Sequence, residues 1–215
     1  MCGHYGSGKT NIAVNMALDL KKQRQNGRVA VADLDIVNPY FRTKDSGKEF
    51  SQAGIRLIVS EFANTNLDLP SMPQDLYAIT DDREMSVILD IGGDDRGALA
   101  LGRIAPKIIE ENNYDMLMVI NKFRPLTPDV ASTLEVLGEI EAAGGIRFTG
   151  LVNNSNLGEE TTAEDVLGST EYALSVSEAS SLPLVMTTVK DSLYEELSGK
   201  IENLFPLTLQ KKPVY

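Results

Sequence analysis

The chain has 215 residues, of which 42% are hydrophobic and 24% charged, and this size and composition are typical of one globular domain spanning residues 1–215. An excess of acidic over basic side chains, 31 against 20, gives a net charge of −11, which repels a phosphate backbone and argues against nucleic acid as the main partner. One cysteine and one histidine exclude a disulfide or a structural metal cluster within one chain and favour a cytoplasmic protein, and no apolar run approaches the ~20 residues of a membrane span.

Short apolar runs alternate with longer stretches of helical period, which predicts an α/β fold with a mostly parallel sheet and helices on both faces. In chain order, the predicted strands are residues 28–33, 55–60, 86–91, 115–121, 147–153 and 182–188. The clearest predicted helices are residues 9–25, 127–143 and 191–204. Each of these helices carries apolar residues at a spacing of three to four, which predicts a face turned towards the core.

A glycine-rich segment at the start of the chain matches the phosphate-loop pattern G-x-x-x-x-G-K-[ST]. Its residues are Gly3, His4, Tyr5, Gly6, Ser7, Gly8, Lys9 and Thr10. The glycines allow the backbone N–H groups to point inward at phosphate oxygens, and the helix that follows presents its positive end to the same anion. In this pattern, Lys9 reaches the β- and γ-phosphates and the Thr10 hydroxyl binds Mg²⁺.

Only Met1 and Cys2 precede this loop, although a phosphate loop normally connects a strand to its helix. Because that strand usually lies inside the sheet, its loss would leave a slot with unpaired N–H and C=O groups. We therefore expect that the first strand is truncated here and that the natural product begins upstream of Met1. In the alternative, residues 207–210 fill the slot.

Three aspartates stand at the ends of predicted strands. Asp33 and Asp35 end the first predicted strand and face the same way, and Asp90 ends an apolar strand before a glycine pair. A P-loop NTPase needs a carboxylate that supports Mg²⁺ and a group that orients the attacking water. We assign Thr10, Asp90 and Asp33 to the metal site, and Lys9, Asp35 and Asp33 to catalysis. For any single aspartate, a role as a helix cap or turn residue is the alternative.

The order of the segments GHYGSGKT, VADLDIVNPYFR and SVILDIGGDD resembles that in the MinD/ParA-like ATPases, the deviant-Walker (SIMIBI-class) branch of P-loop proteins. This branch also includes amidoligases related to dethiobiotin synthetase and cobyrinate diamide synthase. The resemblance covers most of the chain and implies a three-layer P-loop NTPase fold with ATP and Mg²⁺ as cofactors. It also implies that Asp35 orients the hydrolytic water, that Asp33 lies near the metal, and that residues 35–42 and 92–96 form two switch loops.

One position departs from the family pattern. The family's loop reads K-G-G-x-G-K-[ST], and its additional lysine reaches across a dimer to the partner's nucleotide. In this chain His4 occupies that position and Tyr5 replaces the next glycine. A neutral imidazole is a poor substitute for a permanent cation, so hydrolysis completed by a partner's lysine is in doubt, and Arg42 or Arg96 is the alternative cation.

Two segments bear on the identity of the nucleotide. Residues 121–124, Asn-Lys-Phe-Arg, stand where GTPases carry N-K-x-D, and the guanidinium of Arg124 cannot accept hydrogen bonds from guanine, which favours ATP. The resembling family reads adenine with the Asn of a G-x-x-x-N pattern. Residues 150–154 match that pattern and indicate Asn154, with Asn153 as the second choice; a turn role for the pair is the alternative.

Three functions follow from these predictions. The first is an ATP-hydrolysing switch whose state is read by a nucleotide-dependent homodimer or by another protein partner. The second is an ATP-dependent small-molecule kinase or amidoligase, for which the available cations are Arg42, Lys44, Arg56 and Arg103. The third is a nucleotide-binding scaffold with little hydrolysis, which the presence of His4 favours.

Overall fold

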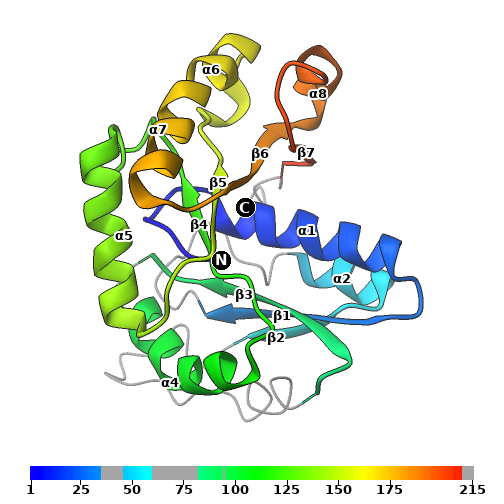
Figure 1. Ribbon diagram of the computed structural model, residues 1–215. Helices are drawn as coiled ribbons and strands as arrows, with labels where there is room; N and C mark the ends of the chain where they lie inside the picture. Colours follow the sequence, from blue (N-terminus) through cyan, green and yellow to red (C-terminus); the bar gives the residue numbers. More distant parts are fainter. Residues whose placement is uncertain (35–45, 60–81, 94, 210–215) are drawn as a thin grey trace, which may run out of the picture.

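The computed structural model describes residues 1–34, 46–59, 82–93 and 95–209, which form parallel strands flanked by helices (Figure 1). The three strands on one side are ordered β2 (Arg56–Val59), β1 (Arg28–Leu34) and β3 (Met85–Ile91). The four on the other side are β4 (Leu117–Ile120), β5 (Gly150–Asn153), β6 (Leu184–Lys190) and β7 (Leu204–Leu207). Every neighbouring pair is parallel, as predicted.

Met1 and Cys2 lie between β3 and β4 and join the two groups of strands. The N–H of Cys2 donates to Leu117 O at 2.9 Å, and the N–H of Val119 donates to Cys2 O at 2.8 Å. On the other side, the N–H of Ile91 donates to Met1 O at 3.1 Å. The two residues therefore occupy the position expected for the strand before a phosphate loop. The alternative that residues 207–210 fill this slot is wrong, because Leu207 belongs to β7, which pairs with β6.

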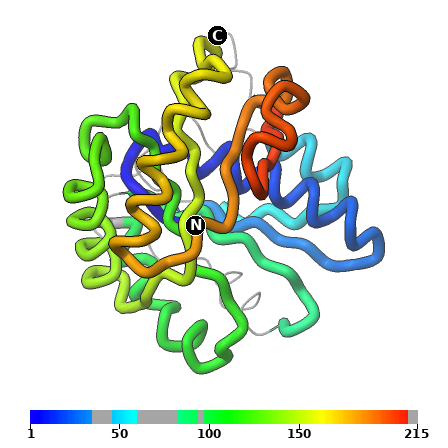
Figure 2. The backbone as a smooth tube through the Cα atoms, turned by 45° about the horizontal axis from the view of Figure 1, so that its top comes forward, coloured from blue at the N-terminus to red at the C-terminus, as the bar shows by residue number. Residues whose placement is uncertain are grey.

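Helices cover both faces of the sheet, which confirms the three-layer fold. On one face, α1 (Lys9–Gln23) and α2 (Gly47–Ala53) pack on the strands. On the other, α4 (Asp95–Glu111), α5 (Val130–Gly144) and α7 (Thr170–Ser180) bury the larger core. Figure 2 shows the blue and cyan helices of the first face to the right and the green helices of the second to the left. Two short helices, α6 (Ala163–Gly168) and α8 (Asp191–Leu197), pack together beside β6 and β7, and a 3₁₀ turn, η2 (Gly158–Glu160), precedes α6.

The ends of the helices follow their sequence signals with one exception. The carboxylate of Asp129 caps α5 by accepting a hydrogen bond from the N–H of Ser132 at 2.9 Å. The predicted helix 191–204 is wrong in its second half, because α8 ends at Leu197 and Gly199 turns the chain with a φ of 81°. The leucine at its far end begins β7 instead. Among the described strands β7 has one neighbour, so Pro206 costs the sheet no central hydrogen bond.

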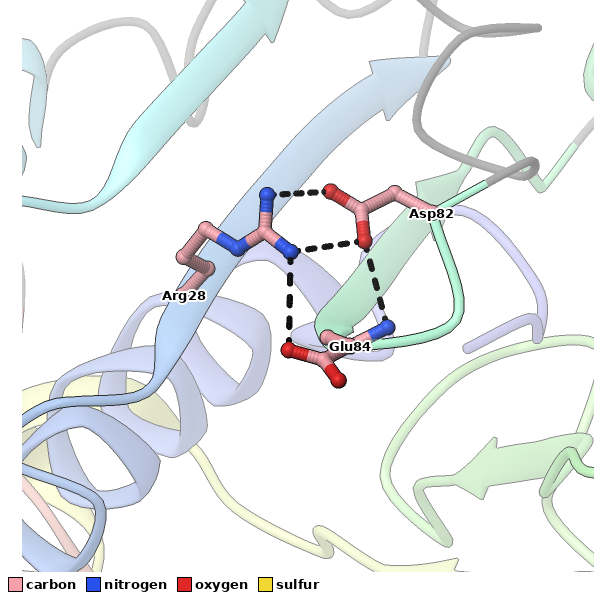
Figure 3. Close-up of polar contacts among 3 residues, drawn as sticks. All are labelled: Arg28, Asp82 and Glu84. Carbon is pink, nitrogen blue, oxygen red and sulfur yellow. Dashed lines mark hydrogen bonds and ion pairs between the residues drawn. The ribbon is translucent and has the colours of Figure 1, made fainter.

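An exposed ionic cluster joins the amino ends of β1 and β3 (Figure 3). The guanidinium of Arg28 lies 2.7 Å from a carboxylate oxygen of Asp82 and 3.9 Å from one of Glu84. The Asp82 carboxylate also accepts a hydrogen bond from the N–H of Glu84 at 3.2 Å. Because such pairs compete with water, we expect them to contribute only about 0.2–1 kcal/mol to the free energy of unfolding.

Within the described ranges, no helix is long and apolar enough to cross a membrane.

Candidate functional site

The predicted phosphate loop curls between the Met1–Cys2 segment and the first turn of α1. Gly6 and Gly8 have φ values of 76° and 92°, in the left-handed region that favours glycine. A Cβ atom on Gly8 would collide with the side-chain nitrogen of Asn154. Helix α1 begins at Lys9, directly after this turn, so the positive end of its dipole faces the loop. The loop therefore has the conformation and the helix end that its sequence predicts.

The interior of the loop holds a cation and a hydroxyl. The Lys9 ammonium donates to Gly3 O at 2.9 Å and to His4 O at 3.1 Å, so this buried side chain folds back into the loop. Ser7 is 1% exposed, and its hydroxyl has no hydrogen-bond partner among the described residues. A buried hydroxyl without a protein partner usually bonds to water, an ion or a ligand. Together with the positive end of α1, these groups fit a phosphate.

Two of the predicted metal ligands stand side by side. Asp33 on β1 and Asp90 on β3 are in register and are 4% and 0% exposed. Two residues before each of them, Val31 and Ile88 pack against α1, and side chains alternate along a strand. Both carboxylates therefore continue the face covered by α1, at the carboxyl edge where that helix begins. Thr10, also buried, lies in the first turn of α1.

The donor set of this edge fits Mg²⁺. Carboxylate and hydroxyl oxygens are the ligands that Mg²⁺ prefers, and the ion usually keeps several waters and binds through one or two carboxylates plus phosphate oxygens. No group of three or more His, Cys, Asp or Glu side chains with metal-binding geometry occurs among the described residues. An all-protein cage is therefore not what these residues form. The predicted catalytic residue Asp35 lies outside the described residues, as do Arg42, Lys44 and Asp94.

The segment after β3 touches the phosphate loop through backbone. A Cβ atom on Gly93 would lie 2.6 Å from Tyr5 N and 2.8 Å from His4 C, and it would also meet the carbonyl oxygen of Gly3. This segment is the start of the predicted second switch. Its contact with the loop therefore depends on the absence of a side chain at position 93.

His4 and Tyr5 occupy the positions where the loop departs from the family pattern. Burial lowers the pKa of His4 below its usual value, and the nearby Lys9 ammonium lowers it further, against a hydrogen bond to Tyr5 O that raises it. The imidazole is therefore neutral at pH 7. Tyr5 is 53% exposed.

Asn154 connects the loop to the ends of β5 and β6. Its side-chain nitrogen donates to Ser7 O at 2.6 Å, and its side-chain oxygen accepts from the Thr188 hydroxyl at 2.6 Å. An amide group has two donors and two acceptor positions, and these two bonds use one of each. Asn153 points elsewhere, because its nitrogen donates to the Ser169 hydroxyl at 3.0 Å. A role of either residue in reading adenine stays a prediction. The link to Ser7 was missed by sequence reasoning.

Of the cations considered for a second substrate, the structure describes two, and neither is shown at this edge. Arg56 begins β2 and therefore lies at the amino edge of the sheet, opposite the phosphate loop. Arg103 is exposed on α4. Arg124, in contrast, approaches the loop from the turn after β4, and a Cβ atom on Gly6 would be in contact with its guanidinium.

No protein-family model matches the chain, and no curated protein matches it. Two similar solved structures are FtsY proteins. FtsY from Mycoplasma mycoides is 13% identical with a TM-score of 0.51, over 88% of this chain and 60% of that one. The signal recognition particle receptor FtsY from Elizabethkingia anophelis, in complex with GDP, is 16% identical with a TM-score of 0.50, over 87% of this chain and 55% of that one.

Identities this low show a shared fold alone, and the chain spans less than two thirds of either relative. The element order, the parallel sheet with helices on both faces and the phosphate loop after its central position define a P-loop NTPase fold. This confirms the predicted fold class. The resemblance to the MinD/ParA-like ATPases in particular stays a prediction.

Proposed function

We propose that this protein binds ATP with Mg²⁺ and hydrolyses it as a molecular switch of the MinD/ParA-like type. The observation that carries the proposal is the phosphate loop at the start of α1, which holds the buried Lys9 ammonium and a Ser7 hydroxyl that has no partner among the described residues. Lys9 donates to carbonyls of its own loop. Phosphate oxygens are stronger acceptors for an ammonium than neutral carbonyls, so the ligand would take over these hydrogen bonds.

Thr10, Asp33 and Asp90 are the residues that would hold Mg²⁺. When bound, the ion neutralises charge that develops on the phosphates. The two carboxylates are buried on neighbouring strands, so their positions are fixed by the sheet before any ligand arrives. Asp35, two residues beyond Asp33, is proposed to orient the attacking water on the basis of the family resemblance.

The switch function is supported by the contact between Gly93 and the loop. Because the segment before α4 packs directly on the backbone of residues 3–5, a ligand that changes the loop also changes the surroundings of that segment. A protein partner or a second copy of the chain would read this change. The neutral His4 supports a second candidate, a nucleotide-binding scaffold with little hydrolysis, because it supplies no cation to a neighbouring subunit.

ATP is preferred to GTP because Arg124 occupies the position from which GTPases accept the hydrogen bonds of guanine. The resemblance to the family's G-x-x-x-N pattern supports the same choice, and its Asn154 lies at the loop, where its side chain bonds to Ser7 O.

Calorimetric titration with ATP and with GTP in the presence of Mg²⁺ tests binding. Lys9→Ala should weaken ATP affinity by about ten- to a hundredfold, because it removes a charge-assisted hydrogen bond. Lys22→Ala, which removes an exposed lysine from the other end of the same helix, is the matched control and should bind as the wild type does. Equal affinity of Lys9→Ala and the wild type would contradict the proposal.

Steady-state phosphate release separates the switch from the scaffold. The switch predicts that Asp35→Ala hydrolyses ATP far more slowly than the wild type. A wild type that binds ATP but releases phosphate no faster than Asp35→Ala is the scaffold. Phosphate release that requires a small-molecule acceptor would instead identify the kinase or amidoligase.

A further inference from the structure

The turn after β4 places a cation against the phosphate loop. A Cβ atom on Gly6 would lie 3.5 Å from Arg124 Nε and 3.6 Å from Arg124 Cζ, so the guanidinium packs where the loop has no side chain. Arg124 Nε is buried and has no hydrogen-bond partner among the described residues. A buried N–H donor usually has an acceptor, and Gly6, which this guanidinium contacts, belongs to the predicted phosphate loop.

The backbone at Arg124 is held firmly. Its N–H donates to Asn121 O at 3.1 Å, and its carbonyl accepts from Thr127 N at 3.1 Å. The fully buried Asn121 side chain accepts from the N–H of Phe123 at 3.0 Å. The turn starts from β4, which pairs with Cys2 immediately before the loop. The backbone from which the Arg124 side chain extends is therefore fixed relative to the loop.

The other basic side chains near the loop either point away from Gly6 or are neutral. The Lys122 ammonium donates to Gly168 O at 3.4 Å, towards the end of α6. His4 is neutral at pH 7, for the reasons given above. Lys9 lies inside the loop. The guanidinium of Arg124, in contrast, packs against the loop at Gly6.

We propose that Arg124 binds the phosphates of the nucleotide and supplies, within one chain, the additional positive charge that position 4 does not supply. This inference rests on the proposed function and names a residue of the same site. The Nε–H and one terminal N–H of a guanidinium form a planar fork that matches two oxygens of a phosphate. Among the described residues Nε has no partner, and Gly6 belongs to the predicted phosphate loop, whose amides are expected to surround the phosphates.

The experiment compares Arg124→Gln and Arg124→Lys with Lys122→Gln, which removes the neighbouring lysine that points to Gly168. Affinities for ATP, ADP, AMP and GTP are measured with Mg²⁺, and melting temperatures show that each variant is folded. Arg124→Gln should weaken ATP binding by about ten- to a hundredfold and AMP binding much less, and any change in the preference between ATP and GTP should come in addition to this dependence on the number of phosphates. Arg124→Lys should lose less because it keeps the charge without the fork, and Lys122→Gln should match the wild type.

Three outcomes contradict the inference, and they are distinguishable. If the wild type binds ATP and folded Arg124→Gln binds it equally well, the inference fails and the proposed function stands. If Arg124→Gln changes the ratio of ATP to GTP affinity but weakens ATP, ADP and AMP equally, Arg124 contacts the base and the inference is overturned. If the wild type binds no nucleotide, the proposed function itself fails.

Discussion

The phosphate loop is contacted in different ways from its two sides. On the side of β4 to β6, side chains hold it: Asn154 bonds to Ser7, Thr188 bonds to Asn154, and Arg124 packs on Gly6. On the side of β3, the contact is made by backbone at Gly93, without a side chain. Hydrogen bonds to side chains fix a position, whereas a glycine contact fills space and fixes no orientation. The first side therefore holds the loop by side-chain hydrogen bonds, and the second side holds it by close backbone packing.

The largest effect is expected when the second side is blocked. Gly93→Ala places a methyl group against the backbone of His4 and Tyr5, so we expect a loss of about 2–3 kcal/mol in the free energy of unfolding. Thermal denaturation should show a melting temperature lower by about 5–10 °C. Gly138→Ala in α5 is the control: its Cβ atom meets nothing within 4 Å, and the change should stabilise the helix slightly. Equal melting of Gly93→Ala and the wild type would show that the contact does not exist.

Removing the anchor on the first side should have the next largest effect. Asn154→Ala deletes two hydrogen bonds of a buried amide and leaves Ser7 O without this donor, so we expect a loss of about 1–3 kcal/mol. Nucleotide titration then separates two roles of Asn154. A purely anchoring residue loses ATP and GTP affinity equally, whereas a residue that also reads adenine loses ATP affinity more. An unchanged affinity for both nucleotides would exclude both roles.

Removal of the metal tests the strand-end carboxylates. Chelation of Mg²⁺ should lower ATP affinity by about tenfold in the wild type, because charge on the phosphates is then neutralised less. In Asp90→Asn the difference between titrations with and without Mg²⁺ should be much smaller. A variant that keeps the full response to Mg²⁺ would remove Asp90 from the metal site, and Asp33→Asn would then be the next candidate.

The smallest effect concerns pH. Because the pKa of His4 is lowered in the folded protein, the unfolded chain takes up this proton first as the pH falls. The folded state therefore loses stability below about pH 6.5, the usual pKa of the unfolded side chain. Urea denaturation at about pH 7.5 and about pH 5.5 should show a smaller decrease for His4→Gln than for the wild type. An identical decrease in both proteins would mean that His4 does not contribute.

The fold and the loop could be predicted because their signals are local. The phosphate loop is one contiguous segment, and Asp33 and Asp90 each end an apolar strand, so their shared edge follows from parallel pairing. The helix 191–204 was predicted too long because its leucines keep helical spacing across the turn at Gly199. Periodicity alone does not distinguish a helix that continues from a helix followed by a short strand.

Contacts between distant segments could not be predicted in the same way. The hydrogen bond from Asn154 to Ser7 joins residues 147 positions apart, and a short motif contains no information about it. Arg124 was recognised from the register of an N-K-x-D pattern, which bears on the base. Its packing on Gly6 became evident only once β4 was placed beside the Met1–Cys2 segment.

The position of Met1 and Cys2 has a mechanical consequence. Among the described strands, the hydrogen bonds that bridge the two half-sheets pass through these two residues, and the loop grows directly out of them. We therefore expect a ligand that makes the loop more rigid to stabilise these hydrogen bonds between β3, the Met1–Cys2 segment and β4 as well. Slower deuterium uptake at the amides of Ile91 in β3 and Val119 in β4 in the presence of nucleotide would show this stabilisation on both sides of the Met1–Cys2 segment.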